Sequence, residues 1–428
     1  MNYFKQIYYE MRHHRMMTWV SISGTALAIF LVMTFIMADG IGRVELSPES
    51  KRSRIMNGMN VHVIGIESPT NMGSNGLNAN LAKKLYTNLD GIEMISFVGA
   101  SGASEKIGFN GVPTVKCSSR GVDENFWKMF DFRFIDGRPF DAAEREAVAN
   151  VVVVTRSLAR SLFAEDKVAG REIEIEGSPH TIVGVVEDVS PLFSNTFAEM
   201  FTVFNVDQQK WPDWNNWLGA TEVYLLREEG VTPEAIKKQV ETRYKQIAPE
   251  AEKDDYNVIY HLQPYTSDDL QSLHGVQNDP ETEQHHRRQW LIYALLILLP
   301  AINLSSMTRS RLRHRVAEIG VRRAFGAKRT DIIAQLLGEN FIITLIGGAI
   351  GLVLSILFIM LFSNLLFNYN ISSNSLKVID VRPEFEMLFR WGNFLIALAG
   401  CFILNMLSAT VPAWRSSRIM PAQALSTH

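Results

Sequence analysis

The sequence predicts an α-helical membrane protein with four transmembrane helices and a large extracytoplasmic mixed α/β domain between the first two. Two observations lead to this fold class. Four stretches without any charged residue are each at least 20 residues long, which is the length that a helix needs to cross a bilayer. The 250 residues between the first two stretches carry the alternating strand and helix patterns of a folded soluble domain.

The four predicted spans carry no charged residue along their whole length. They cover residues 16–38, 289–308, 340–365 and 391–414. A secretory signal is the alternative for the first of them, but it would have a shorter apolar core and a small-residue cleavage site. The sequence around Ala38-Asp39 has no clear Ala-x-Ala pattern, so we interpret the first stretch as a membrane anchor.

Basic residues predict the orientation. Thirteen lysines and arginines flank the spans on the side of the N-terminus, whereas the short loop over 366–390 holds three. Basic flanks stay in the cytosol, so both termini are expected there and the large domain in the periplasm of a bacterial inner membrane. Arg287 and Arg288 run against this rule, but four arginines over 309–315 outnumber them.

The large domain, residues 39–288, contains two β-α-β units that are far apart in the sequence. The first has a strand over 59–66, a helix carrying Leu77, Leu81, Leu85 and Leu89, and a strand over 92–98; the second has a strand over 222–226, a helix from Thr232-Pro233 to about 247, and a strand over 256–262. Threonine followed by proline is typical of a helix start. We expect the two units to form one split ferredoxin-like layer.

A separate β-rich block is predicted between these units, from about 121 to 219. It holds an apolar strand over 151–154, a short helix over 157–163, and two strands over 172–176 and 181–186. Gly177 and Pro179 mark a hairpin turn between the last two strands. Close by, Trp211, Trp214 and Trp217 are spaced by three residues. They either pack locally under a loop or form a partner-binding patch, because tryptophan is enriched at interface hot spots.

The loop over 309–339 predicts a short basic amphipathic helix between the second and third spans. Gly326 suits the left-handed position that ends a helix, and Thr330 is expected to cap the next one. Such a helix either lies on anionic lipid or docks on a partner protein and transmits force into the membrane.

Composition and motifs exclude several function classes. The formal net charge is −3, whereas a nucleic-acid binder needs clustered positive charge. Two cysteines, Cys117 and Cys401, exclude a disulfide framework. The dipeptide Gly-Lys does not occur, so a nucleotide-hydrolysing P-loop is absent from this sequence. The pairs His13-His14 and His285-His286 lack the spacing of a metal site, and we expect neither a metal nor catalysis.

The spans themselves are expected to pack closely rather than to line a solute channel. No charge lies within them, whereas intramembrane charges mark ion and substrate paths. Gly347, Gly351 and Ser355 recur every fourth residue, as do Gly24 and Ala28. This pattern lets helices approach closely, either within one chain or between two copies.

The run from Ala317 to Lys328, AEIGVRRAFGAK, resembles the signature of the FtsX-like permease domain of MacB-type ABC transporters. The C-terminal sequence from Pro412 to Leu425 is similar to the ending of that family. Gly137-Arg138-Pro139-Phe140, followed by VVVVTRSLARSLF and TIVGVVEDV, resembles its periplasmic core domain. The resemblance covers nearly the whole chain in the right order.

The resemblance implies a permease that works with a separate ABC ATPase subunit, which binds ATP and Mg²⁺, and with a second permease protomer, identical or not. MacB carries a fused nucleotide-binding domain, and this sequence departs from that pattern. The expected coupling residues, which dock on the ATPase, are Glu318, Ile319, Gly320, Arg322, Arg323, Ala324, Phe325, Gly326 and Ala327. A periplasmic adaptor and an outer-membrane channel are further partners that the sequence leaves open.

Three functions fit this architecture. The first is efflux of antimicrobial compounds or peptides from the periplasm. The second is release of lipoproteins, as by the LolCDE complex. The third is FtsX-like regulation of a periplasmic hydrolase, although the insert is larger than is usual there.

The predicted boundaries are 1–15 cytosolic, 16–38 span, 39–288 periplasmic domain (units 56–120 and 220–265, insert 121–219, stalk segments 39–55 and 266–288), 289–308 span, 309–339 coupling loop, 340–365 span, 366–390 outer loop, 391–414 span and 415–428 cytosolic tail.

Overall fold

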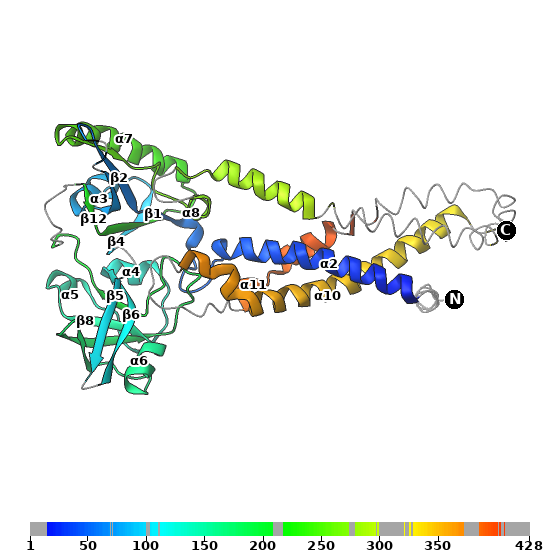
Figure 1. Cartoon of the computed structure of the whole chain (residues 1–428), viewed down its shortest axis with the longest axis horizontal. Helices are drawn as coiled ribbons and strands as arrows, with labels where there is room; N and C mark the ends of the chain where they lie inside the picture. The colour runs from blue at the N-terminus through cyan, green and yellow to red at the C-terminus, as the bar shows by residue number, and fades with distance from the viewer. Residues whose placement is uncertain are drawn as a thin grey trace. The chain divides into compact units, whose positions relative to one another are not determined.

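The computed structural model divides the chain into two compact units, which are described separately (Figure 1). One unit holds the predicted spans. The other, which we call the lobe, comprises Gly42–His285 and Phe367–Arg382. The structure describes residues 15–406 except 69, 71, 100–102, 110–111, 209–216, 274–278, 297, 299–320, 322–324, 327, 372–384, 401 and 404–405.

Two seven-stranded sheets, A and B, build the lobe. Sheet A consists of β1 (Ile55–Gly58), β2 (Asn60–Gly65), β3 (Met72–Leu77), β4 (Ile92–Gly99), β12 (Leu218–Gly219), β13 (Thr221–Arg227) and β14 (Tyr256–Ile259). Sheet B consists of β5 (Ala103–Phe109), β6 (Val112–Val122), β7 (Phe134–Gly137), β8 (Val151–Thr155), β9 (Glu172–Ile175), β10 (Ser178–Val186) and β11 (Met200–Val203). The helices of the lobe are α3 (Ala79–Tyr86), α4 (Glu124–Met129), α5 (Ala142–Glu146), α6 (Arg156–Phe163), α7 (Pro233–Lys253) and α8 (Ser267–Ser272).

Both predicted β-α-β units are present, and they share sheet A. Strand β13 pairs with β1 on one side and with β4 on the other, while β14 pairs with β2, and all of these pairings are antiparallel. Strands of the two units therefore alternate, as expected for a split layer. Strand β3 is an addition that pairs with β2. The closing strand is shorter than predicted, because β14 ends at Ile259 and a turn follows.

The leucine repeat of the first unit is buried, but only part of it is helical. Helix α3 begins after Asn78, whose side chain accepts a hydrogen bond from the Asn80 backbone. Leu81 and Leu85 lie in the helix, Leu77 ends β3, and Leu89 follows the helix. All four join the core between sheet A, α3 and α7. The repeat thus continues the core beyond the helix ends.

Sheet B begins earlier than predicted. Strands β5 and β6 pair with each other, and β6 pairs with β11, so residues from 103 onward belong to this sheet and not to the first β-α-β unit. The pairs β10–β8, β8–β11, β11–β6, β6–β5, β5–β9 and β9–β10 form a closed circuit. Apolar side chains fill the barrel, among them Ile107, Val152 and Ile182.

The hairpin turn between β9 and β10 lies one position earlier than predicted. Ser178 pairs with Ile175, so the two-residue loop is Glu176-Gly177. Both loop residues have positive φ, 50° and 86°, which is the conformation of a type I′ hairpin turn. Pro179 is therefore a strand residue of β10, opposite Glu174, and not a turn residue.

Among the described residues, two helices of the other unit are long and apolar enough to cross a membrane. The first, Thr18–Arg43, consists of α2 (Arg15–Gly40) from Thr18 onward and the 3₁₀ turn η1 (Ile41–Arg43), and the second, Leu337–Phe367, lies within α10 (Arg329–Ile371). The described parts of 289–308 and 391–414 are also helical, and the short α11 (Phe385–Leu388) precedes the latter. The total of four spans stays a prediction. Helix α10 begins at Arg329, so Thr330 lies inside it rather than at its cap.

Candidate functional site

The predicted coupling segment lies mostly outside the described residues. This applies to Glu318, Ile319, Gly320, Arg322, Arg323, Ala324 and Ala327. Phe325 and Gly326 are described, and they mark a helix end: the Phe325 N–H donates to the Val321 carbonyl at 3.1 Å. Gly326 has φ of +92°, the left-handed conformation predicted for it.

The ring of Phe325 is exposed in this chain. The residue is 89% exposed, whereas a phenylalanine ring is normally buried. Gly326 has no side chain, and nothing stands within 4 Å of the position that a Cβ would take. An exposed aromatic ring beside open backbone can be covered by another surface. The docking role expected for this segment stays a prediction.

The helix that follows leads directly into a membrane span. Helix α10 runs for 43 residues from Arg329, and its backbone departs from helical angles at Phe362. A helix transmits displacement along its axis because its backbone hydrogen bonds keep its length constant. The apolar part of α10 starts at Leu337, eight residues after the first residue of the helix.

Small residues bring α10 into close contact with α2. A Cβ at Gly351 would stand 2.5 Å from the Ala26 carbonyl oxygen, and one at Gly347 would stand 2.8 Å from the Thr25 Cβ. Any larger side chain would push the helices apart. The small-residue repeat therefore serves packing within this chain, the first of the two alternatives that the sequence left open.

Trp217 is a core residue. It is 6% exposed and packs with the side chains between sheet A and its helices. Trp211 and Trp214 lie outside the described residues. The prediction of a partner-binding patch is therefore wrong for Trp217, because this residue is buried in the core beside β12.

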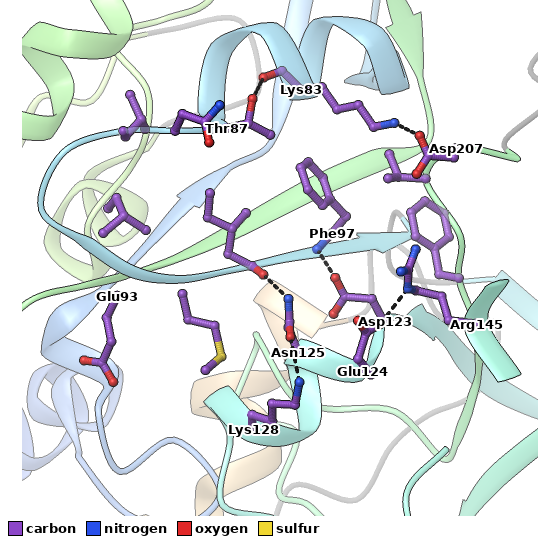
Figure 2. Close-up of a pocket in the computed structure, with 17 residues that line it drawn as sticks. Lys83, Thr87, Glu93, Phe97, Asp123, Glu124, Asn125, Lys128, Arg145 and Asp207 are labelled. Carbon is purple, nitrogen blue, oxygen red and sulfur yellow. Dashed lines mark hydrogen bonds and ion pairs between the residues drawn. The ribbon is translucent and has the colours of Figure 1, made fainter. Parts of the chain in front are cut away.

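A pocket of about 630 Å³ lies in the lobe between α3, β4, α4 and residues 204–207 (Figure 2). Charged side chains on its walls pair with each other. Lys83 pairs with Asp207, and the Arg145 Nε lies 2.7 Å from the Glu124 Oε2. The Lys128 amine donates to the Asn125 amide oxygen at 3.2 Å. Each of these three cations thus has a hydrogen-bond or ion-pair partner within the lobe.

Asp123 is the most buried acid of this pocket and caps α4. Its carboxylate accepts hydrogen bonds from the Ser96 hydroxyl at 2.6 Å and from the backbone N–H groups of Phe97 and Phe126. Burial raises the pKa of the Asp123 carboxyl to about 6, although these hydrogen bonds oppose the rise. The residue fastens α4 to β4, which is a structural role.

A second buried acid, Glu49, joins the chain after α2 to sheet B. Its carboxylate accepts hydrogen bonds from the Asn195 backbone at 3.1 Å and the Thr196 hydroxyl at 3.0 Å, and it lies 3.3 Å from the Arg52 Nε. Desolvation raises the pKa of Glu49 despite these partners. Sequence analysis missed Glu49 and Asp123, because their partners come from distant segments.

Described residues contain no group of three or more histidines, cysteines or acids arranged to hold a metal ion. The described part of the chain thus offers contacts and packing as its candidate functional features, and these are Phe325, Gly326 and the α2–α10 interface.

Two family models match the chain. The MacB-like periplasmic core domain matches residues 18–243, and the FtsX-like permease C-terminal model matches residues 290–421. The first covers more than half of the chain.

Curated relatives are distant. The macrolide export ATP-binding/permease protein MacB of Pasteurella multocida is 24% identical over 315 residues, which cover 73% of this chain and 43% of that protein. MacB of Escherichia coli O157:H7 is 24% identical, with 73% and 44% covered. The uncharacterized ABC transporter permease YvrN of Bacillus subtilis is 25% identical, with 54% and 55% covered. The chain thus spans less than half the length of the MacB relatives it matches.

Solved structures include two periplasmic or permease fragments with low similarity. A domain of a putative permease protein from Porphyromonas gingivalis has a TM-score of 0.37 at 20% identity, covering 50% of this chain and 91% of that one. The periplasmic region of MacB from Actinobacillus actinomycetemcomitans has a TM-score of 0.35 at 14% identity, covering 50% and 92%.

Proposed function

Because the chain belongs to the MacB-type ABC transporter permeases, membrane proteins with a periplasmic domain, we propose that it couples ATP hydrolysis by a separate ATPase subunit to conformational work in the periplasm. In this proposal, ATP and Mg²⁺ are bound by that partner. A second permease protomer completes the proposed assembly.

One observation carries the proposal: an exposed phenylalanine ends a helix immediately before α10. Phe325 is 89% exposed, and only three residues separate it from the first residue of α10. Burying a phenylalanine ring stabilises a complex by roughly 1.5–3 kcal/mol. The ATPase would cover this ring, and its movement would pull on α10.

The proposed work is efflux of antimicrobial compounds or peptides. The names of the MacB relatives state macrolide export for those proteins. The same assembly with another cargo would release lipoproteins, and an assembly that moves nothing would regulate a periplasmic hydrolase. Deletion of the gene separates the first two: sensitivity to antimicrobial compounds supports efflux, and lipoproteins stranded in the inner membrane support release. Binding of a hydrolase to the lobe would support regulation.

The test is affinity purification of the full chain from membranes, with identification of co-eluting proteins and measurement of ATP hydrolysis. We expect an ABC ATPase to co-elute. Phe325→Ala and Glu318→Lys should leave membrane insertion intact and reduce the co-eluting ATPase about tenfold, which corresponds to 1.4 kcal/mol of lost binding.

The matched control is Phe385→Ala, which removes another exposed phenylalanine, 54% exposed, from α11. It should retain the ATPase at the wild-type level. Equal retention of the ATPase by the wild-type chain and by both coupling variants would remove the docking role from this segment.

A further inference from the structure

The short helix α8 lies within the second stalk segment, and the residues in and around it contact the first stalk segment and sheet A. It follows β14 in the chain and precedes the helix over 282–296 that leads to the second predicted span. Three other parts of the chain contact it: the first stalk segment through Arg43 and Arg52, α7 through Lys237, and the helix over 282–296 through Thr282.

Asp269 holds three of these elements together. Its carboxylate accepts hydrogen bonds from the Lys237 amine of α7 at 2.6 Å and from the Thr282 hydroxyl at 2.7 Å. It also closes a capping box with Thr266 at the start of α8. The side chain is 8% exposed, so water does not compete strongly for these bonds. Loss of this carboxylate would leave a partly buried lysine and a partly buried hydroxyl without this acceptor.

The first stalk segment contacts the neighbouring face of α8. The Arg43 Nε donates to the Asp268 carboxylate at 2.6 Å. The Gln271 side chain lies directly over Gly42, in the space that a Cβ would occupy. Arg43 is three residues beyond the end of α2. This segment therefore cannot shift along α8 without breaking an ion pair and a close contact.

The second stalk segment is fixed from the other side. The Ser272 hydroxyl, which is fully buried, lies 3.1 Å from the Thr282 hydroxyl and donates to the Asp269 carbonyl at 2.8 Å. Just before α8, Tyr265 exchanges two backbone hydrogen bonds of 2.8 Å with Asn57 at the end of β1. The helix from 282 is thus tied to sheet A through α8.

We infer that α8 is a rigid joint that makes the two stalk segments and sheet A move as one body, with Asp269 as its positioning residue. The inference deepens the proposed function, because a stroke delivered to either span reaches the lobe through this joint. The contacts that form the joint all lie within the lobe. The joint acts by fixing direction, and a flexible tether of the same length would lose the displacement.

The first test is hydrogen exchange of the full chain in nanodiscs, without ATP. Asp269→Ala should speed exchange of the amides in 266–272 and 282–290 by about tenfold or more, while β6 and β13 stay protected. Glu250→Ala is the matched control, since it removes an acid that pairs with Lys84 on the far side of α7. An effect limited to 266–272 would overturn the joint.

If Asp269→Ala loosens the whole lobe, exchanging the charges of Arg43 and Asp268 provides a second test of the joint. Arg43→Asp and Asp268→Arg should each speed exchange in 282–290, because each breaks the ion pair between the first stalk segment and α8. The double variant restores the pair with reversed charges and should return exchange to the wild-type rate. Failure of the double variant to restore protection would overturn the joint.

The second test uses the full chain with its co-purified ATPase, with and without ATP and vanadate. In the wild type, nucleotide should change amide exchange within the lobe. In Asp269→Ala, hydrolysis should continue while the lobe no longer responds. A lobe that still responds in Asp269→Ala overturns the joint and leaves the proposed function standing. Failure of any ATPase to co-purify overturns the proposed function, and the nanodisc exchange data then decide on the joint alone.

Discussion

The two sheets of the lobe are joined by aromatic rings, whereas the lobe is joined to its stalk segments by polar side chains. Between the sheets, Phe126 of α4 lies within 6 Å of the rings of Phe130, Phe132 and Phe201. Around α8, the contacts are ion pairs and hydrogen bonds of Asp268 and Asp269. An aromatic core is stable but weakly directional, while hydrogen bonds fix direction at a smaller gain in stability.

One strand, β13, is buried in the cores on both sides of sheet A. Strand β13 supplies both cores: Val223 and Leu225 face α3 and α7, while Tyr224 and Leu226 pack against sheet B. Successive side chains of a strand point to opposite faces, so one strand is buried on both sides. Separating the sheets would expose half of this strand together with the aromatic cluster. The polar joint at α8 can be broken without that cost.

The strongest test of this contrast removes the centre of the aromatic core. Phe126 is fully buried, and Phe126→Ala should lower the free energy of unfolding by about 3–5 kcal/mol, because it leaves a cavity. The measurement is urea unfolding of the full chain in detergent, followed by near-UV circular dichroism. Phe325→Ala, at an exposed phenylalanine, should cost less than about 0.5 kcal/mol. A loss below about 1 kcal/mol for Phe126→Ala would show that the sheets are held by something else.

Local patterns predicted the elements of sheet A well. Thr232-Pro233 does begin α7, and the leucine repeat after Leu77 is buried throughout. The helix α7 ran further than expected, to Lys253, with Pro249 inside it. The apolar residues Ile247 and Ala251 continue its buried face, and this packing outweighs the proline.

Long-range pairing could not be predicted in the same way. Strands β5 and β6 look locally like the end of the first β-α-β unit, and only their pairing with β11 and β9 places them in sheet B. The turn at Glu176 requires a positive φ that a glutamate rarely adopts, so the sequence favoured Pro179. Arg43 and Asp268 are separated by 225 positions, and no local pattern connects them. For the site, Gly326 was predictable from its motif, while the joint at α8 was not.

A buried acid in each region has a shifted pKa, and the two shifts have opposite signs. Folding raises the pKa of Asp123, beside the aromatic core, to about 6 because the carboxyl is buried. Its stabilising effect is therefore present below its ordinary pKa and is lost as the pH rises through about 6. For Asp269, burial opposes ionisation, but hydrogen bonds from Lys237, Thr266 and Thr282 outweigh it and lower the pKa. Its stabilising effect is present above its ordinary pKa and is lost as the pH falls below it.

We therefore expect the contribution of Asp123 to the unfolding free energy of the full chain to be about 1 kcal/mol larger at pH 5 than at pH 7. The contribution of Asp269 should be the same at both pH values. The measurement is the difference in unfolding free energy between the wild type and Asp123→Asn at both pH values. Taking this difference removes the contribution of Glu49, whose pKa is also raised. A difference that stays constant with pH, or changes in the opposite direction, would show that the Asp123 carboxyl is not penalised by burial.

The smallest expected effect comes from an ion pair that has the chemistry of the α8 joint but not its burial. The Lys84 amine lies 2.5 Å from the Glu250 carboxylate and links α3 to α7, and about half of each side chain is exposed. Water and salt screen such a pair, so Lys84→Ala and Glu250→Ala should each change the unfolding free energy by less than about 1 kcal/mol. A double-mutant cycle should give a coupling energy below about 0.5 kcal/mol that vanishes in 0.5 M salt. If the coupling exceeded 1 kcal/mol and survived salt, short distance alone would explain a strong contact, and the burial of Asp269 would no longer set the joint apart from ordinary surface pairs.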